Sequence, residues 1–246
     1  VRGGDIAFGD LIDFTVPTGN FGNILAGWFA REMGLPVGKL YCASNANDVL
    51  DDFIRTGVYD ANRPFVKTNS PSMDILVSSN LERFIYLMSD RNGAAVAEDM
   101  QALAKDGRYR VANEVVARMQ NVLASGAIDE AGTLAIIGDV FAKTGYLLDT
   151  HTAVGVGVAE KANDGRVMVV DSTANPHKFV GAVWQAVNGE ASDASDLELL
   201  DTLSEKTGVP VHRALADLTS KPKCERRSIT VADINDSVLD IIKSRK

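Results

Sequence analysis

The sequence predicts an α/β fold built around a parallel sheet. Residues 11–16 form a short, mainly apolar segment that suits a strand, and apolar residues then recur at helical spacing as far as Met33. Residues 39–43 repeat the strand pattern, and a second helical pattern follows and ends at Gly57. Residues 167–170 are an unbroken apolar run, which is typical of a strand buried on both faces. Strands that alternate with helices in this way build parallel sheets.

The first half of the chain begins with two strand–helix units. The first helix is expected over residues 23–33, with Asn23 as its N-cap and Gly34 as the residue that ends it. The second helix is expected to be capped by Ser44 or Asn45.

A mainly helical region is predicted next. Residues 58–71 lack periodicity and are expected to form a loop. Ser79, followed three residues later by Glu82, forms a capping box for a helix that runs to Met88. Apolar periodicity between residues 91 and 145 then predicts three helices and no strand. These helices are expected over residues 94–105, 111–124 and 129–144.

One strand and further helices complete the pattern. A helix of small residues is expected over residues 153–161, capped by Thr152 or Asp149, and we expect the apolar strand 167–170 to be central. Pro176 is expected to begin the next helix. The remaining predicted elements are a turn at 163–165, helices over 197–206, 212–218 and 231–243, and a linker over 221–223.

These elements divide the chain into three regions. Residues 1–57 and 146–189 are expected to form part of an α/β core, residues 58–145 a mainly helical region, and residues 190–246 a peripheral helical extension. The first residue is Val1, and no strand is predicted before residue 11. We therefore expect a C-terminal portion of a longer protein, with a core that is incomplete at its N-terminus.

Composition narrows the class of protein. Of the 246 residues, 46% are hydrophobic, which supports a substantial core, and the net charge of −8 argues against a nucleic-acid partner. No apolar run approaches the roughly 18 residues of a membrane span. Cys42 and Cys224 lie far apart, which favours a reduced, cytoplasmic setting, although their pairing stays open. The three histidines have no metal-ligand spacing, so no metal site is predicted.

The loop between the first strand and the first helix carries the strongest functional signal. It contains Gly19, Asn20, Phe21, Gly22 and Asn23 in succession. Glycines let a backbone approach a ligand closely, and the unpaired N–H groups of a first helical turn attract anions. The loop lacks the Walker and dinucleotide-binding fingerprints. We interpret it as a phosphate cradle, while the same residues also suit an ordinary turn.

A second group of polar residues lies at a helix start. Ser78, Ser79 and Asn80 offer short donors, and Arg83, one turn later, has a planar fork that bonds two phosphate oxygens. This group is a candidate second anion site, and a capped helix with a solvated arginine is the alternative. His151 either binds an acidic group of a substrate or is a structural histidine that bonds a carbonyl.

Three more residues have side chains suited to a site. Thr173 follows the apolar strand 167–170, at the edge where open α/β sheets bind ligands, and the alternative is an N-cap for the helix at Pro176. Asp74 and Asp149 have carboxylates suited to a general base. Aspartate is far more often a cap, so neither is assigned.

Several stretches, taken in order, resemble threonine synthase, and the resemblance extends to about Ala186. They are VPTGNFGNILAG at residues 16–27, SPSMDI at 70–75, SSNLER at 78–83, DTHTAVG at 149–155 and STANPHKF at 172–179. That family belongs to the enzymes that use pyridoxal 5′-phosphate (PLP) and have a tryptophan-synthase-β-like fold.

The resemblance implies a cofactor, a reaction and roles for the candidate residues. The loop of Gly19 to Asn23 would hold the PLP phosphate, and Thr173, with Ser172 as second choice, would bond the pyridine nitrogen and leave it largely unprotonated. The reaction would convert O-phospho-L-homoserine and water to L-threonine and phosphate, by γ-elimination of phosphate and β-addition of water. The groups at Ser78 to Arg83, with His151, would then bind the substrate.

Two features limit what this chain is expected to supply. In the family, the lysine that forms a Schiff base with PLP lies upstream, so no catalytic residue is assigned here and the chain alone is expected to be inactive. Asn175 and His177 stand where the family pattern is expected to have His and Ala.

Other functions stay open at this point. Another PLP-dependent dehydratase of the same fold would need no site for a substrate phosphate. A non-catalytic module that binds a phosphorylated metabolite, or serves only as structure, would need no lysine. The sequence predicts neither a membrane nor a nucleic-acid partner, and it does not decide between a monomer and a homodimer.

Overall fold

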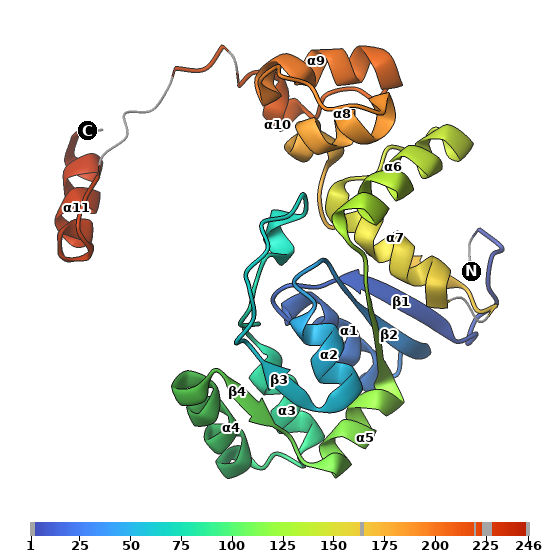
Figure 1. The fold of residues 1–246 in the computed structure, drawn as a ribbon, viewed down its shortest axis with the longest axis vertical. Helices are drawn as coiled ribbons and strands as arrows, with labels where there is room; N and C mark the ends of the chain where they lie inside the picture. Colours follow the sequence, from blue (N-terminus) through green and yellow to red (C-terminus); the bar gives the residue numbers. More distant parts are fainter. Residues whose placement is uncertain (1–2, 163–164, 219, 223–227, 245–246) are drawn as a thin grey trace.

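A four-stranded parallel sheet is the centre of the structure, a computed structural model that describes residues 3–162, 165–218, 220–222 and 228–244 (Figure 1). Its strand order is β5-β2-β1-β6, and a separate antiparallel pair joins β3 to β4. The strands are β1 (Ile12–Pro17), β2 (Val37–Ser44), β3 (Val58–Asp60), β4 (Arg108–Arg110), β5 (Leu123–Ala127) and β6 (Met168–Val170). The predicted α/β fold with a parallel sheet is therefore confirmed.

Helices precede or follow nearly every strand. The α-helices are α1 (Gly22–Glu32), α2 (Val49–Thr56), α3 (Leu81–Met88), α4 (Gly93–Asp106), α5 (Asn113–Val122), α6 (Glu130–Thr144), α7 (Thr150–Ala162), α8 (Val180–Asn188), α9 (Asp196–Thr207), α10 (Arg213–Ala216) and α11 (Ile234–Ser244). The 3₁₀ helices are η1 (Pro71–Met73), η2 (Pro176–Phe179) and η3 (Val231–Asp233). Apolar periodicity thus located the long helices correctly.

The two faces of the main sheet are covered by different helices. Leu40 and Cys42 of β2 belong to a buried cluster that also contains residues of α1, α2 and α5. The alternate residues, Tyr41 and Ala43, pack with Val158 of α7 on the opposite face (Figure 1). A sheet covered on both faces explains why β1 and β2 carry so few exposed polar side chains.

Aromatic side chains fasten α3 to α1. Phe84 of α3 is fully buried, with its ring centroid 5.4 Å from that of Phe21 and 6.1 Å from that of Trp28. Because Phe21 immediately precedes α1, this packing also fixes the start of that helix.

A β-bulge in β2 is held by a buried carboxylate. Between Ile12 and Phe14 the pairing shifts, so that β2 contains one residue more than β1 over the same stretch. The Oδ1 atom of Asp13, whose side chain is fully buried, accepts the backbone N–H of Lys39 at 2.6 Å and lies 3.2 Å from Nη1 of Arg166. Asp13 therefore satisfies an amide in the bulge that regular pairing with β1 would otherwise satisfy.

The short strands were predicted wrongly. β3 lies in the segment expected to be a loop, and β4 and β5 lie in the region expected to contain no strand. β5 also ends α5 at Val122, before the predicted boundary of residue 124. β6 is at the edge of the described sheet and not at its centre, because it pairs with β1 alone.

Several predicted helix boundaries also need correction. The N-cap of α2 is Asp48, not Ser44 or Asn45, and Pro176 begins the 3₁₀ helix η2, with α8 starting only at Val180. The helices expected in the last region are present as α9, α10 and α11. The predicted turn at 163–165, the linker at 221–223 and Cys224 fall wholly or partly outside the described residues.

Two kinds of feature are absent from the described residues. Among them there is no helix with the length and apolar character needed to cross a lipid bilayer. The same residues include no cluster of side chains suited to hold a metal ion.

The role of Asp13 predicts a stability effect. Asp13→Ala removes the acceptor for the Lys39 amide and the partner of Arg166, so the free energy of unfolding should fall by about 1.5–3 kcal/mol. Urea unfolding measures this change. Asp139→Ala, at an exposed position on α6, is the matched control and should change stability by less than about 0.5 kcal/mol. Equal midpoints for the two variants would contradict the assignment.

Candidate functional site

The candidate site lies at the edge of the sheet where the strands end. Because β1, β2, β5 and β6 run in parallel, their carboxyl ends lie at the same edge. The loop after β1 leads into α1, and the loop after β6 leads into η2. The backbone N–H of Asp171 donates to the carbonyl of Thr15 at 3.0 Å, which keeps these two loops adjacent at their start. This is the edge at which open α/β sheets bind ligands.

The start of α1 presents unused backbone donors. The N-cap is the buried Phe21, so the expected N-cap role of Asn23 is wrong and Asn23 is the second residue of the helix. Among the described residues, no acceptor is found for the backbone N–H groups of Gly19, Asn20, Gly22 and Asn23. Gly22 and Asn23 are exposed, so an anion can reach this turn from solvent.

The loop after β1 is fastened to the segment before α3. The N–H of Phe21 donates to the carbonyl of Ser79 at 2.8 Å, and the hydroxyl of Ser78 donates to the carbonyl of Gly19 at 2.7 Å. The N–H of Ser79 donates to Oδ1 of Asn20 at 3.1 Å. These contacts bring the predicted phosphate cradle and the predicted second anion site together. The Ser78 hydroxyl and the Ser79 amide already donate to protein groups, so they are not free to bind an anion.

The predicted capping box at Ser79 and Glu82 is wrong. α3 begins at Leu81, and its N-cap is Asn80, whose side chain makes no cap hydrogen bond and whose φ of 71° is left-handed. Asn80 instead lies beside the cradle: a Cβ added to Gly22 would be 3.5 Å from its Nδ2 atom.

Arg83 lies on the exposed face of α3. It lines an apolar groove with Phe29, Tyr86 and Val96, and it has no ion-pair partner among the described residues. The guanidinium group is therefore available for an anion, and its surroundings also match the alternative of a solvated arginine on a helix face.

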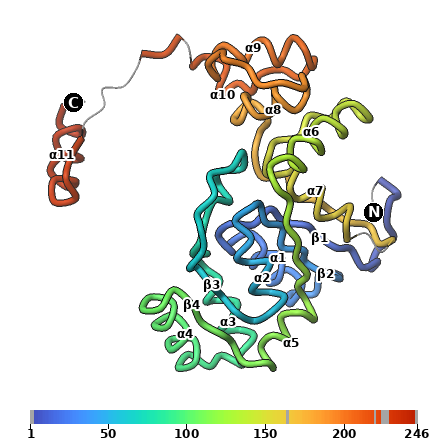
Figure 2. Tube along the Cα trace, in the orientation of Figure 1, coloured from blue at the N-terminus to red at the C-terminus, as the bar shows by residue number. Residues whose placement is uncertain are grey.

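A second glycine contact involves the segment around η1. A Cβ at Gly19 would lie 2.8 Å from the carbonyl oxygen of Ser72 and 3.0 Å from the Cα of Met73. The first distance is shorter than real Cβ contacts and the second is tighter than nearly all of them, so only glycine fits while that backbone keeps its place. Figure 2 shows the long loop between β3 and α3 reaching toward the start of α7.

Asp149 and His151 lie at the start of α7 and are both buried. The Asp149 carboxylate accepts the N–H of His151 at 2.8 Å, the N–H of Thr152 at 3.2 Å and the hydroxyl of Thr152. Burial alone would raise the pKa of this carboxyl, but the hydrogen bonds from His151 and Thr152 outweigh it and lower the pKa. Asp149 is therefore the cap of α7, one of the two candidates predicted from the sequence.

Both ring nitrogens of His151 have contacts within the protein. Nε2 accepts the N–H of Ser72 at 3.1 Å, and Nδ1 lies 3.4 Å from Oδ1 of Asp149. The ring centroid is 4.6 Å from that of Phe179 in η2. This environment resembles that of a structural histidine more than that of a residue facing a ligand.

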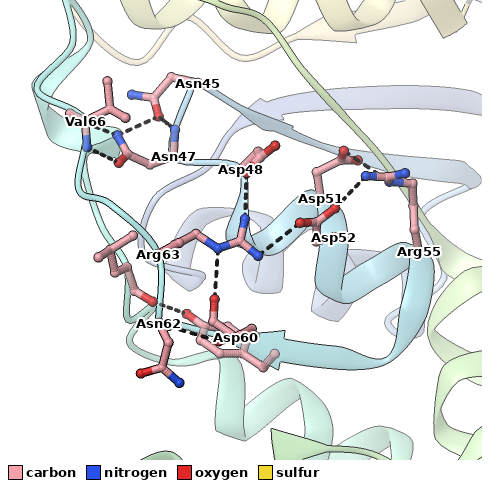
Figure 3. Close-up of polar contacts among 12 residues, drawn as sticks. Asn45, Asn47, Asp48, Asp51, Asp52, Arg55, Asp60, Asn62, Arg63 and Val66 are labelled. Carbon is pink, nitrogen blue, oxygen red and sulfur yellow. Dashed lines mark hydrogen bonds and ion pairs between the residues drawn. The ribbon is translucent and has the colours of Figure 1, made fainter. Parts of the chain in front are cut away.

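Asp74 belongs to a network of amides and hydroxyls at the end of β2. Its carboxylate accepts hydrogen bonds from Asn45, Asn47 and Thr68 at 2.6–3.1 Å. Asn47 also exchanges hydrogen bonds with the backbone of Val66, as Figure 3 shows. These contacts give Asp74 a structural role in holding the loop after β3.

Arg63 fastens the first part of the same loop to the start of α2. Its guanidinium donates to Asp48 at 2.7 Å and to Asp52 at 3.0 Å, and its Nε donates to the carbonyl of Asp60 at 2.9 Å (Figure 3). Sequence reasoning missed this residue and the amide network, although the Asn-rich stretch after β2 was a usable signal.

Thr173 is exposed after the end of β6, and its hydroxyl has no partner among the described residues. The cap of η2 is Asn175, whose Oδ1 accepts the N–H of His177 at 3.0 Å. The alternative role of Thr173 as a helix cap is therefore excluded. Ser172, one residue earlier, is also exposed.

Two other buried side chains take no part in the site. Burial raises the pKa of the Cys42 thiol to about 12, so this cysteine is not a nucleophile at neutral pH. His177 has no hydrogen-bond partner for either ring nitrogen among the described residues, and its burial, together with nearby His212, lowers its pKa. The departure of Asn175 and His177 from the expected family pattern has no further structural explanation.

Comparison with known proteins supports the resemblance. The family model described as "Threonine synthase, C-terminal" matches residues 152–236. Human threonine synthase-like 1 is 38% identical over 238 residues, which are 96% of this chain and 32% of that protein. Threonine synthase of Pseudomonas aeruginosa is 42% identical over 182 residues, which are 73% of this chain and 39% of that protein.

Solved structures extend the likeness to the fold. Yeast threonine synthase is 32% identical, with a TM-score of 0.79 over 95% of this chain and 48% of that chain. PLP-bound threonine synthase from Brucella melitensis is 38% identical, with a TM-score of 0.72 over 82% of this chain and 46% of that chain. The chain thus spans from 32% to 48% of the length of these relatives. It belongs to the threonine synthase family and corresponds to a C-terminal portion of that family's full-length members.

Proposed function

We propose that the protein containing this chain binds PLP, with the cofactor phosphate at the start of α1. The observation that carries the proposal is the set of unused N–H groups at Gly19, Asn20, Gly22 and Asn23, next to a helix N-terminus. A relative that is 38% identical to this chain over the region they share has been solved with PLP bound, which supports the choice of ligand. The residues present therefore fit a phosphate dianion.

The chain also offers a partner for the cofactor ring. Thr173 is exposed at the same edge of the sheet, and its hydroxyl bonds to none of the residues that the structure describes. PLP supplies an electron sink that stabilises negative charge next to the amino group of a bound amino acid. A neutral hydroxyl at the pyridine nitrogen leaves that nitrogen largely unprotonated, and Ser172 is the alternative donor. This chain would thus bind and orient the cofactor.

The proposed reaction is that of threonine synthase, a lyase that converts O-phospho-L-homoserine and water to L-threonine and phosphate. This substrate carries its own phosphate, so a second anion site is required. Asn80 and Arg83 are the proposed groups, because Asn80 lies beside Gly22 and the Arg83 guanidinium has no ion-pair partner in the described residues. Ser78 and Ser79 would act mainly by shaping the loop, since their polar groups already bond Gly19 and Asn20.

A second candidate function follows from the names of the relatives. Four relatives that match at least 94% of this chain are called threonine synthase-like 1, and not threonine synthase. Another PLP-dependent lyase or dehydratase on the same fold would suit such proteins. The test is to incubate the full-length protein with PLP and O-phospho-L-homoserine and to measure phosphate and L-threonine. Phosphate without threonine would favour the second candidate, and no product with bound PLP would favour a binding module.

The cradle predicts the effect of a charge at position 22. A Cβ there meets only Asn80 Nδ2 at an ordinary 3.5 Å, so Gly22→Asp should fold while placing a carboxylate against the phosphate. Loss of charged hydrogen bonds should weaken PLP binding by about ten- to a hundredfold. Ala26→Asp, exposed one turn along α1, adds the same charge and should bind PLP normally. An unchanged affinity of the Gly22 variant, measured by absorbance titration, would disprove the cradle.

The proposed role of Thr173 predicts a separation of turnover from cofactor content. Thr173→Ala removes one neutral hydrogen bond, with a net value of about 0.5–1.5 kcal/mol, while the phosphate stays held. Steady-state turnover should therefore fall more than the PLP content of the purified protein. Thr173→Ser keeps the hydroxyl and should retain most of the activity. Wild-type turnover of the alanine variant would transfer the role to Ser172.

The second anion site predicts a change in kcat/KM. Arg83→Lys keeps the charge but loses the planar fork, so kcat/KM for O-phospho-L-homoserine should fall roughly ten- to a hundredfold, as expected for the loss of a charged hydrogen bond. PLP content should stay normal. Arg110→Lys, at an exposed position on β4, is the matched control. If both variants show equal phosphate release, Arg83 belongs to the solvated face of α3.

A further inference from the structure

The position of Gly19 in the cradle depends on the backbone at Ser72 and Met73. These two segments are so close that a Cβ at Gly19 would lie 2.8 Å from the Ser72 carbonyl oxygen. On its other side, Gly19 accepts the Ser78 hydroxyl through its carbonyl at 2.7 Å. A shift of the Ser72–Met73 backbone would therefore change the place of Gly19, or open a gap behind it.

His151 bonds this backbone directly at Ser72. Its Nε2 accepts the Ser72 N–H at 3.1 Å, and this amide belongs to the first turn of η1, where no helical partner exists. A nitrogen that accepts carries no hydrogen, so the neutral ring has its hydrogen on Nδ1. Nδ1 lies 3.4 Å from Oδ1 of Asp149 and 3.3 Å from the Thr150 hydroxyl, which supports this tautomer.

The ring itself has little freedom to move. His151 is only 2% exposed, and Phe179 packs against it with a centroid separation of 4.6 Å. The Asp149 carboxylate that faces the ring is fixed in turn by the N–H groups of His151 and Thr152. The start of α7 thus presents one acceptor in a fixed place to Ser72.

We propose that His151 is a positioning residue for the phosphate cradle. His151 acts on Gly19 through Ser72, and it does not contact the substrate. The proposal rests on the proposed function, in which the cradle binds the phosphate of PLP. Asp149 takes part by fixing the ring and its tautomer. The role differs from substrate binding because both ring nitrogens already face protein groups.

The test uses two variants of the full-length protein and two probes. His151→Leu removes the acceptor, and His151→Gln places an amide oxygen near the place of Nε2. The probes are PLP and pyridoxal, which lacks the phosphate, each titrated by absorbance. His151→Leu should bind PLP roughly three- to tenfold more weakly than wild type, as expected for one lost hydrogen bond, and pyridoxal equally well. His151→Gln should restore the affinity for PLP.

Other outcomes would overturn the proposal. Normal PLP affinity of His151→Leu with a raised KM for O-phospho-L-homoserine would return His151 to substrate binding. Equal weakening of PLP and pyridoxal, with a lower melting temperature in both variants, would indicate a general structural role. A wild-type protein that binds no PLP would refute the proposed function itself. A wild-type protein that binds PLP, with a His151→Leu variant of equal affinity, would refute only the positioning role of His151.

Discussion

The contact between the loop after β1 and the segment before α3 is the interaction on which the candidate site depends. A loop with two glycines would lose much conformational freedom on folding, and the hydrogen bonds from Phe21, Ser78 and Ser79 offset that cost. The Phe21 ring, fully buried against Phe84, adds an apolar anchor in the middle of the loop. The unused N–H groups beside it are therefore held in place before any ligand arrives, which favours binding because less ordering remains to be done.

Much of the fold follows from periodicity, and the exceptions have physical reasons. Long helices such as α6 have apolar residues at regular spacing over several turns, and these were predicted close to their observed limits. β5 contains Ser125 and Gly126 among alanines, so its composition resembled the end of a helix, and only its pairing with β2 makes it a strand. β6 has the composition of a central strand, yet sheet position depends on partners and not on the strand's own residues.

The site was predictable where it is local in sequence. Gly19 to Asn23 are consecutive, so the cradle could be identified from the loop alone. The Ser78 hydroxyl also looked like a free donor, because its partner Gly19 is 59 residues away. The sequence likewise could not show that Nε2 of His151 is occupied, because its donor Ser72 lies 79 residues earlier in the chain. A sequence shows which groups are present, and the structure shows which of them are already occupied.

The bulge in β2 decides which side of the sheet each following residue faces. Successive strand residues point to opposite faces, so one extra residue reverses the orientation of everything after it. Because of the bulge, Val37, Leu40 and Cys42 all reach the α1 face, and Tyr41 reaches the α7 face. Deletion of Gly38 or Lys39 would leave Val37 and Leu40 two residues apart in a regular strand, so both would keep the α1 face. The deletion would remove the bulge itself, and with it the amide that the buried Asp13 carboxylate accepts.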